Sequence, residues 1–178
     1  MKRRTEAKRL ALCGILAALA VGLMFLGGMI PIAVFACPVL ASMVLIPVYC
    51  ECGFRFGLVW YGAVALLCVL LGPDKEAAIL FVFFGYYPML QKLIGRLRNR
   101  GVKWLLKLLY FNISIFAAYA LMLYVFRLAA VTEEFRQTER IMLIVFLALG
   151  NVALIIYDIL IDRLELFYHL RLRPKLKL

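Results

Sequence analysis

Charged residues divide this chain into long apolar stretches joined by short polar ones. Positions 10–50 form a run of 41 residues without Asp, Glu, Lys or Arg. A helix needs roughly 20 residues, at about 1.5 Å each, to cross about 30 Å of hydrocarbon, so this run is long enough for two crossings. Two glycines and two prolines lie near its middle, in GGMIPIAVFACP (27–38), where they interrupt helical structure. The pattern therefore predicts two transmembrane spans, at 9–30 and 35–52.

Four further apolar stretches of similar length follow. They lie at 56–72, 76–94, 104–126 and 141–161. Together with the first two spans they predict an all-α integral membrane protein, a bundle of six transmembrane helices. We expect a single domain covering 1–178, with a basic tail at 163–178.

Composition supports placement in a lipid bilayer. Hydrophobic residues make up 66% of the chain, charged residues 17%, and the mean hydropathy is +0.98. Soluble domains are about 45–50% apolar and about 25% charged. A chain of 178 residues cannot cover so much apolar surface with its own core. We therefore expect lipid to surround it.

Lys and Arg are distributed unequally between the two sides that six spans define. If the N-terminus is cytoplasmic, 17 of the 21 Lys and Arg residues fall in cytoplasmic segments. The outer loops hold only Lys75, Arg127, Arg136 and Arg140. Because Lys and Arg favour the cytoplasmic ends of spans, we expect both termini to be cytoplasmic. The net charge of +11 is spread over four segments on one membrane face, which suits lipid head groups and not nucleic acid.

Residue types that carry chemistry are few. His169 is the sole histidine and lies in the basic tail, so a metal site of the H-E-x-x-H kind is excluded. Neither G-x-x-x-x-G-K-[ST] nor G-x-S-x-G occurs, so the sequence contains no common motif for ATP hydrolysis or for a serine hydrolase. We therefore predict no enzyme activity, no catalytic residue, no metal site and no cofactor.

The five cysteines do not predict a disulfide framework, because most of them fall within spans or at their cytoplasmic ends. Cys50 and Cys52 are the most closely spaced pair. A structural thiolate metal site needs about four ligands, which the sequence does not supply nearby. Packing as small apolar residues is the favoured interpretation, and the role of Cys50 and Cys52 stays open.

Small residues line one face of the first predicted span. Gly14, Ala18 and Gly22 recur at every fourth position, with further alanines beside them. Such a flat face lets another helix approach closely. The partner helix could belong to another protein, or the face could pack within this chain's own bundle.

Polar residues share one face of the sixth predicted span. Asn151, Asp158 and Asp162 lie at i, i+7 and i+11. Ionisable residues at membrane depth are candidates for function. However, Lys103 and Lys107 lie at the same predicted depth, near the cytoplasmic side, so we favour a structural ion pair of Lys107 with Asp158 and Asp162. Asn151 is predicted to lie in mid-span.

Aromatic and uncharged polar residues gather in the predicted outer half. Tyr86 and Tyr87 lie in GYYP (85–88), whose glycine and proline loosen the fourth span, and Tyr119 and Asn151 lie at similar depth. Loosened backbone within a membrane is tolerated where it faces protein or a cavity. These residues predict a pocket for a small, partly aromatic solute. The alternative is an interfacial belt of aromatic side chains.

The first helix ALCGILAALAVG (11–22) and the loop GGMIPIAVFACP (27–38), within six spans, resemble the substrate-binding S components of energy-coupling factor (ECF) transporters. The resemblance covers the whole chain. It implies an importer subunit in a prokaryotic plasma membrane that captures a small vitamin-like solute from outside. Gly14, Ala18 and Gly22 would dock on a transmembrane T component driven by ATP-binding subunits.

The resemblance also implies where the solute binds. Tyr86, Tyr87, Tyr119 and Asn151 would line the pocket, under outer loops at 27–37, 72–76 and 129–140. No motif identifies the solute, and an outer histidine cluster for nickel or cobalt is missing from the sequence.

Two alternatives remain. The chain could be a non-transporting envelope scaffold, similar to the rod-shape-determining membrane proteins, which needs partner surfaces but no solute pocket. It could also be a small proton-coupled carrier that uses Asp158 and Asp162, although both lie near one membrane face and not in mid-span.

Overall fold

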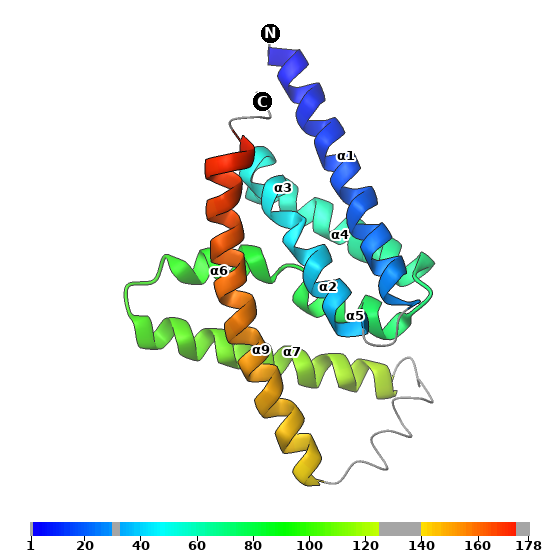
Figure 1. Cartoon of the computed structure of the whole chain (residues 1–178), viewed down its shortest axis with the longest axis vertical. Helices are drawn as coiled ribbons and strands as arrows, with labels where there is room; N and C mark the ends of the chain where they lie inside the picture. Colours follow the sequence, from blue (N-terminus) through cyan, green and yellow to red (C-terminus); the bar gives the residue numbers. More distant parts are fainter. Residues whose placement is uncertain (1, 30–32, 125–139, 174–178) are drawn as a thin grey trace. The chain divides into compact units, whose positions relative to one another are not determined.

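The computed structural model describes residues 2–29, 33–124 and 140–173, and within these ranges the chain is helical, without β-strands (Figure 1). The all-α class is therefore confirmed. The elements are α1 (Lys2–Gly27), α2 (Ala33–Met43), α3 (Leu45–Cys52), α4 (Phe54–Leu71), α5 (Lys75–Phe84), α6 (Tyr87–Gly95), α7 (Arg100–Tyr124), α9 (Arg140–Phe167) and the π-helical turn η1 (Tyr168–Leu172).

Five helical segments among the described residues are long and apolar enough to cross a membrane. They are Glu6–Gly27, Ala33–Cys52, Phe54–Leu71, Lys75–Gly95 and Arg100–Leu121. These segments correspond to the first five predicted spans. The sixth predicted span, 141–161, lies in α9, where the side chains of 140–144 and 146 are outside the described residues. The six-span count and the orientation of the termini therefore stay predictions.

Two of the predicted spans are interrupted, and proline explains both interruptions. The span predicted at 35–52 consists of α2 and α3, and the span predicted at 76–94 consists of α5 and α6. Proline has no N–H group, and its ring crowds the carbonyl group four residues earlier. Pro47 lies four residues after the last residue of α2, and Pro88 lies four residues after the last residue of α5. Each helix therefore ends at the residue whose carbonyl group the proline ring would crowd.

The last helix is longer than predicted. α9 passes the expected end at 161 and continues through Phe167 into η1. The sequence has no glycine or proline between Gly150 and Pro174, so nothing in it stops the helix at the predicted boundary. Residues 163–172 of the predicted basic tail are therefore helical.

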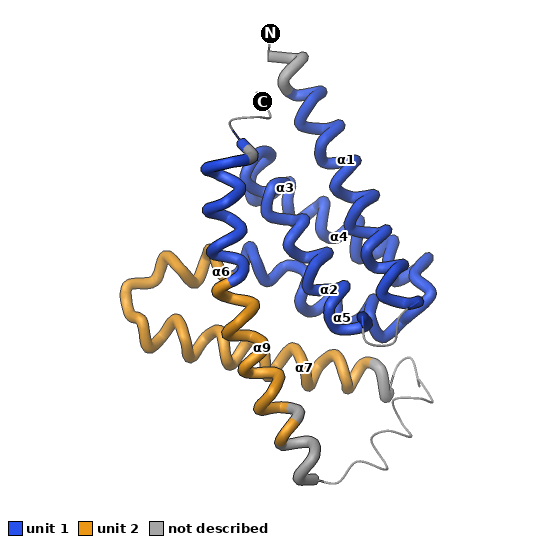
Figure 2. The backbone as a smooth tube through the Cα atoms, in the orientation of Figure 1, with its two compact units in different colours: residues 1–90, 160–178 blue, residues 91–159 orange. Residues whose placement is uncertain are grey.

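The chain forms two compact units, residues 1–90 with 160–178 and residues 91–159 (Figure 2). In the first unit α1 packs on α2 and α4, and α2 packs on α5. The Trp60 indole donates a hydrogen bond to the Cys13 carbonyl oxygen, 2.9 Å away, and joins α4 to α1. The largest side chains that are fully buried in this unit include Phe81, Tyr87, Leu45, Ile46 and Val64.

Large apolar side chains also cover the outside of the helices. Val59 and Leu70 of α4, Leu105 of α7 and Ile156 of α9 are all at least 60% exposed. Soluble monomers rarely expose large contiguous apolar areas. Together with the five apolar helices, this outward distribution indicates insertion into a membrane.

Candidate functional site

Tyr86 and Tyr87, two of the predicted pocket residues, lie where α5 gives way to α6 in the first unit. The Tyr87 side chain is fully buried. Tyr86 is half-buried, and its ring packs at a tilt against the Tyr61 ring of α4, with centroids 5.6 Å apart. Tyr87 therefore belongs to the core of the unit, whereas part of the Tyr86 side chain remains accessible.

The backbone at this break makes hydrogen bonds within the protein. The Tyr61 hydroxyl donates to the carbonyl oxygen of Val82. The Gly85 N–H donates to the Phe81 carbonyl oxygen, 2.7 Å away, and Gly85 is buried. In an apolar environment an unpaired backbone group is costly, so Tyr61 stabilises the carbonyl group of Val82 where the helix ends.

Tyr119 and Asn151, the other two predicted pocket residues, lie on α7 and α9 in the second unit. Tyr119 is half-buried. The Asn151 amide donates to the Leu147 carbonyl oxygen at 2.8 Å, and its Oδ1 accepts a hydrogen bond from Asn112 Nδ2 at 3.2 Å. Sequence reasoning did not identify Asn112. Its signal is a single amide within the apolar run LLYFNISIF (108–116).

The four residues predicted to line a single pocket are thus divided between the two units, two in each. The pocket itself stays a prediction. A hollow of about 420 Å³ lies at the start of α7 in the second unit, and none of the four lines it. Its walls are Asn99, Arg100, Gly101, Val102 and Leu105. Of the outer loops predicted to cover the pocket, residues 30–32 and 129–139 lie outside the described part of the chain.

Lys107 of α7 and Asp158 of α9 form a buried ion pair. Lys107 Nζ lies 2.6 Å from Asp158 Oδ2, and the two side chains are only 11% and 6% exposed. Gln91 Nε2 donates to the Asp158 backbone carbonyl oxygen, 3.0 Å away. Lys107 also lies over the Trp104 ring, 5.5 Å from its centroid. These contacts join α6, α7 and α9 within the second unit.

Two other charged residues, Asp162 and Lys103, are expected at this depth. Asp162 belongs to the first unit and is exposed. Lys103 Nζ donates to the Gly95 carbonyl oxygen, 2.7 Å away. Asp158 is therefore the carboxylate that the second unit places on Lys107, and a part for Asp162 in the same ion pair stays a prediction.

The small-residue face of α1 is not covered by the other helices of the first unit. Gly14, Ala18 and Gly22 are exposed. A Cβ atom built on either glycine has no neighbour within 4 Å. α1 instead packs inward through a different face, which includes the buried residues Cys13, Ala20 and Met24.

Glu51 is a buried carboxylate that sequence reasoning did not identify. Its side chain is 2% exposed, and Arg173 Nε lies 3.1 Å from Oε1. The Tyr168 hydroxyl donates to the same oxygen at 3.2 Å. Burial, followed by the nearby Glu51 carboxylate, raises the pKa of Tyr168, so the phenol keeps the proton that it donates. These bonds fasten the end of α3 to η1.

Comparison with protein-family models, with curated proteins and with solved structures gave no match, so the residues themselves are the basis for inferring function.

Proposed function

We propose that this chain is the membrane-embedded substrate-binding component of an ECF-type importer. It would capture a small vitamin-like solute outside the cell and dock on a T component driven by ATP-binding subunits. The proposal includes six spans in the plasma membrane of a prokaryote, with both termini in the cytoplasm. The proposal is based on the resemblance of the first helix and the first loop to those of S components.

The exposed face of α1 is the observation that supports this proposal most strongly. Association of helices in lipid depends on close packing, which small residues permit. If Gly14, Ala18 and Gly22 served packing within the first unit, its other helices would cover them. They are exposed, and a Cβ on Gly14 or Gly22 would meet nothing. A helix of a partner protein fits such a surface.

Solute binding would involve Tyr86, Tyr119 and Asn151. Tyr86 and Tyr119 are half-buried aromatic side chains with accessible surface that can contact a solute. The Asn151 amide would hydrogen-bond to the solute, and the bound solute would compete with Asn112 for it. Replacement of Asn151 by leucine should then weaken binding.

A non-transporting envelope scaffold is the second candidate, and two observations favour it. Tyr87 is completely buried, and Asn151 bonds to Asn112 and to the Leu147 carbonyl oxygen. Both side chains therefore have structural roles that a protein without cargo also needs. In a scaffold, the face of α1 would bind an envelope partner.

Replacing Gly14 or Ala18 by leucine should abolish docking and leave solute binding unchanged. A leucine on this face holds the partner helix away, whereas the chain's own packing is not disturbed. The measurement is co-purification of the T component and the ATPases after joint expression. Thermal stability against a panel of vitamins supplies the second readout, since a ligand at 100 times its Kd adds about 2.7 kcal/mol.

Gly62→Leu is the matched control, because Gly62 of α4 is also exposed and a Cβ there meets nothing within 4 Å. Equal loss of docking in this variant would show that α1 is not the specific surface. If the unchanged protein recruits no T component and responds to no vitamin, the scaffold is the better description.

A further inference from the structure

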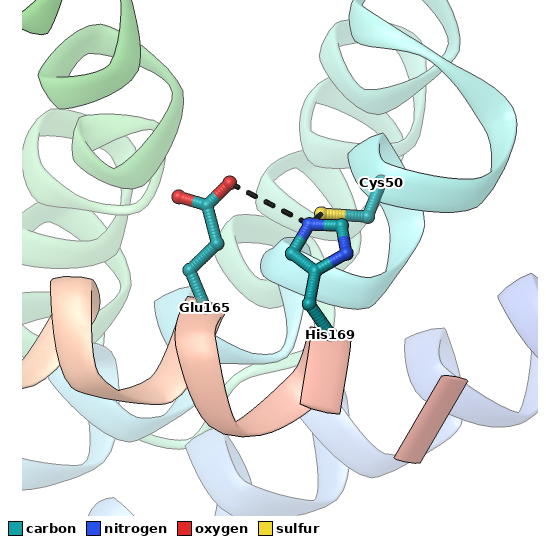
Figure 3. Close-up of side chains that lie close together, drawn as sticks. All are labelled: Cys50, Glu165 and His169. Atoms are coloured by element: carbon teal, nitrogen blue, oxygen red, sulfur yellow. Dashed lines mark hydrogen bonds and ion pairs between the residues drawn. The ribbon is translucent and has the colours of Figure 1, made fainter. Parts of the chain in front are cut away.

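Three side chains of metal-binding type meet at one end of the first unit. Cys50 lies in the last turn of α3, Glu165 lies near the end of α9, and His169 lies one turn further on, in η1. Figure 3 shows the three side chains directed toward one another, and their ligand atoms all lie within 4.8 Å of one another. In sequence, Cys50 and His169 are 119 positions apart.

The thiol and the carboxylate approach the same ring nitrogen. Cys50 Sγ lies 3.7 Å from His169 Nε2, and Glu165 Oε1 lies 3.9 Å from that atom. In a neutral imidazole, Nε2 either carries a proton or accepts one, so it cannot satisfy a thiol donor and a carboxylate acceptor at once. The 3.9 Å separation is also too long for a direct hydrogen bond. A cation among the three atoms could take all of them as ligands.

The separations are close to those of a tetrahedral zinc site. Zinc binds sulfur at about 2.3 Å and nitrogen or oxygen at about 2.0–2.2 Å, so tetrahedral ligand atoms lie roughly 3.3–3.7 Å apart. Cys50 Sγ, at 3.7 Å from His169 Nε2, reaches this range, Glu165 Oε1, at 3.9 Å, lies beyond it, and the Cys50 and Glu165 ligand atoms lie within 4.8 Å of each other. Glu165 and His169, at i and i+4, present both ligands on one helical face. Small shifts of the three side chains would complete the geometry.

We propose that Cys50, Glu165 and His169 bind Zn²⁺, with three protein ligands and a fourth position open to water. A thiolate and a carboxylate together neutralise the two charges of the ion. The neighbouring Glu51 is already paired with Arg173 and contributes no unpaired charge. Cys50 lies at the negative C-terminal end of α3, which favours a cation.

The surroundings allow the ion to enter and to be held. The His169 side chain is 40% exposed, whereas Glu165 and Cys50 are partly buried. The bound ion would connect the end of α3 with the end of α9, beside the Glu51 contacts that already join α3 to η1. This site is independent of the proposed transport function.

Cys52 provides a matched control two positions away. Its sulfur lies 3.2 Å from the Cys13 sulfur of α1, in a different contact from that of Cys50. A zinc site that uses Cys50 should therefore survive the loss of Cys52.

The test uses the full chain, purified in reduced form without a polyhistidine tag, stripped with a chelator and titrated with Zn²⁺ or Co²⁺. We expect one metal ion per chain, and Co²⁺ should give a thiolate charge-transfer band and the visible bands of tetrahedral geometry. Cys50→Ser and His169→Asn should each weaken binding by more than about 100-fold, since even the loss of a supporting residue around the ligands costs about 10–100-fold. Cys52→Ser should bind as the unchanged protein does.

His169→Asn alters an exposed side chain, so loss of binding in this variant does not reflect misfolding, and an unchanged circular dichroism spectrum should show this. Three results would each overturn the proposal: no stoichiometric binding by the unchanged protein, a Co²⁺ spectrum without the thiolate band, or equal affinity in Cys50→Ser and Cys52→Ser.

Discussion

Replacement of Asp158 by alanine should lower the free energy of unfolding by about 3–5 kcal/mol, because it leaves the buried Lys107 ammonium group without its partner. The two charged atoms lie 2.6 Å apart, and both side chains are almost fully buried. The measurement is reversible unfolding of the detergent-purified protein, followed by circular dichroism.

The double variant Lys107→Met with Asp158→Leu is the control. It removes both charges and replaces them with apolar groups of similar volume, which is often neutral or stabilising by about 1–4 kcal/mol. We expect it to be far more stable than Asp158→Ala alone. If Asp158→Ala costs less than about 1 kcal/mol, as exposed pairs do, the pair is not buried in the folded protein.

Replacement of Gly85 by alanine should destabilise the protein by about 1–3 kcal/mol, the usual cost of forcing extra atoms into a packed core. A Cβ atom at Gly85 would lie 2.5 Å from the Phe81 carbonyl oxygen and 2.8 Å from a Tyr61 ring carbon. The backbone conformation of Gly85, with φ −63° and ψ −29°, suits any residue. The expected loss of stability therefore comes from steric collision and not from backbone strain.

Gly62→Ala is the control for this effect, because a Cβ at Gly62 meets nothing within 4 Å. Where space is available, Gly→Ala stabilises by about 0.4–1 kcal/mol through the unfolded state. The same unfolding measurement applies to both variants. Equal stabilities of the two variants would contradict the close contacts at Gly85, because they would show that the turn between α5 and α6 can accommodate a methyl group.

The helical class and five of the apolar segments were predictable from sequence, because an uncharged run of sufficient length has few alternatives. The interruptions within spans were harder to place. Pro47 and Pro88 are visible in the sequence, but a proline can kink a helix or end it, and packing decides which. Gly85 was recognised as a weak point, whereas the end of α2 at Met43 was not predicted.

Polar side chains within the spans were partly predictable. The expected depth of Lys107 and Asp158 placed them at one level, and they lie in contact. Asn112 was not predicted, because it is a single amide within an apolar run and has no polar residue one helical turn away. When two helices run antiparallel, a residue further along one helix meets a residue earlier in the other. Asn112 follows Lys107 and Asn151 precedes Asp158, so the Lys107–Asp158 pair predicts the Asn112–Asn151 pair.

The cluster of Cys50, Glu165 and His169 could not be found by spacing. The sequence predicts no metal site, because its single histidine has no second ligand at a recognisable interval. The fold brings its ligands from opposite parts of the chain, and it does so through the unpredicted extension of α9 into η1. Contacts of that kind depend on tertiary packing and leave no local pattern.

Thiol labelling of intact cells is the most direct measurement of the six-span topology. Single cysteines would be introduced as Lys75→Cys, Arg136→Cys and Arg98→Cys in a variant whose native cysteines are replaced by alanine. A membrane-impermeant maleimide should label positions 75 and 136 from outside, and position 98 only after the membrane is permeabilised. Labelling of position 98 in intact cells, with no reaction at 75 and 136, would reverse the orientation and place the proposed solute pocket on the wrong side of the membrane.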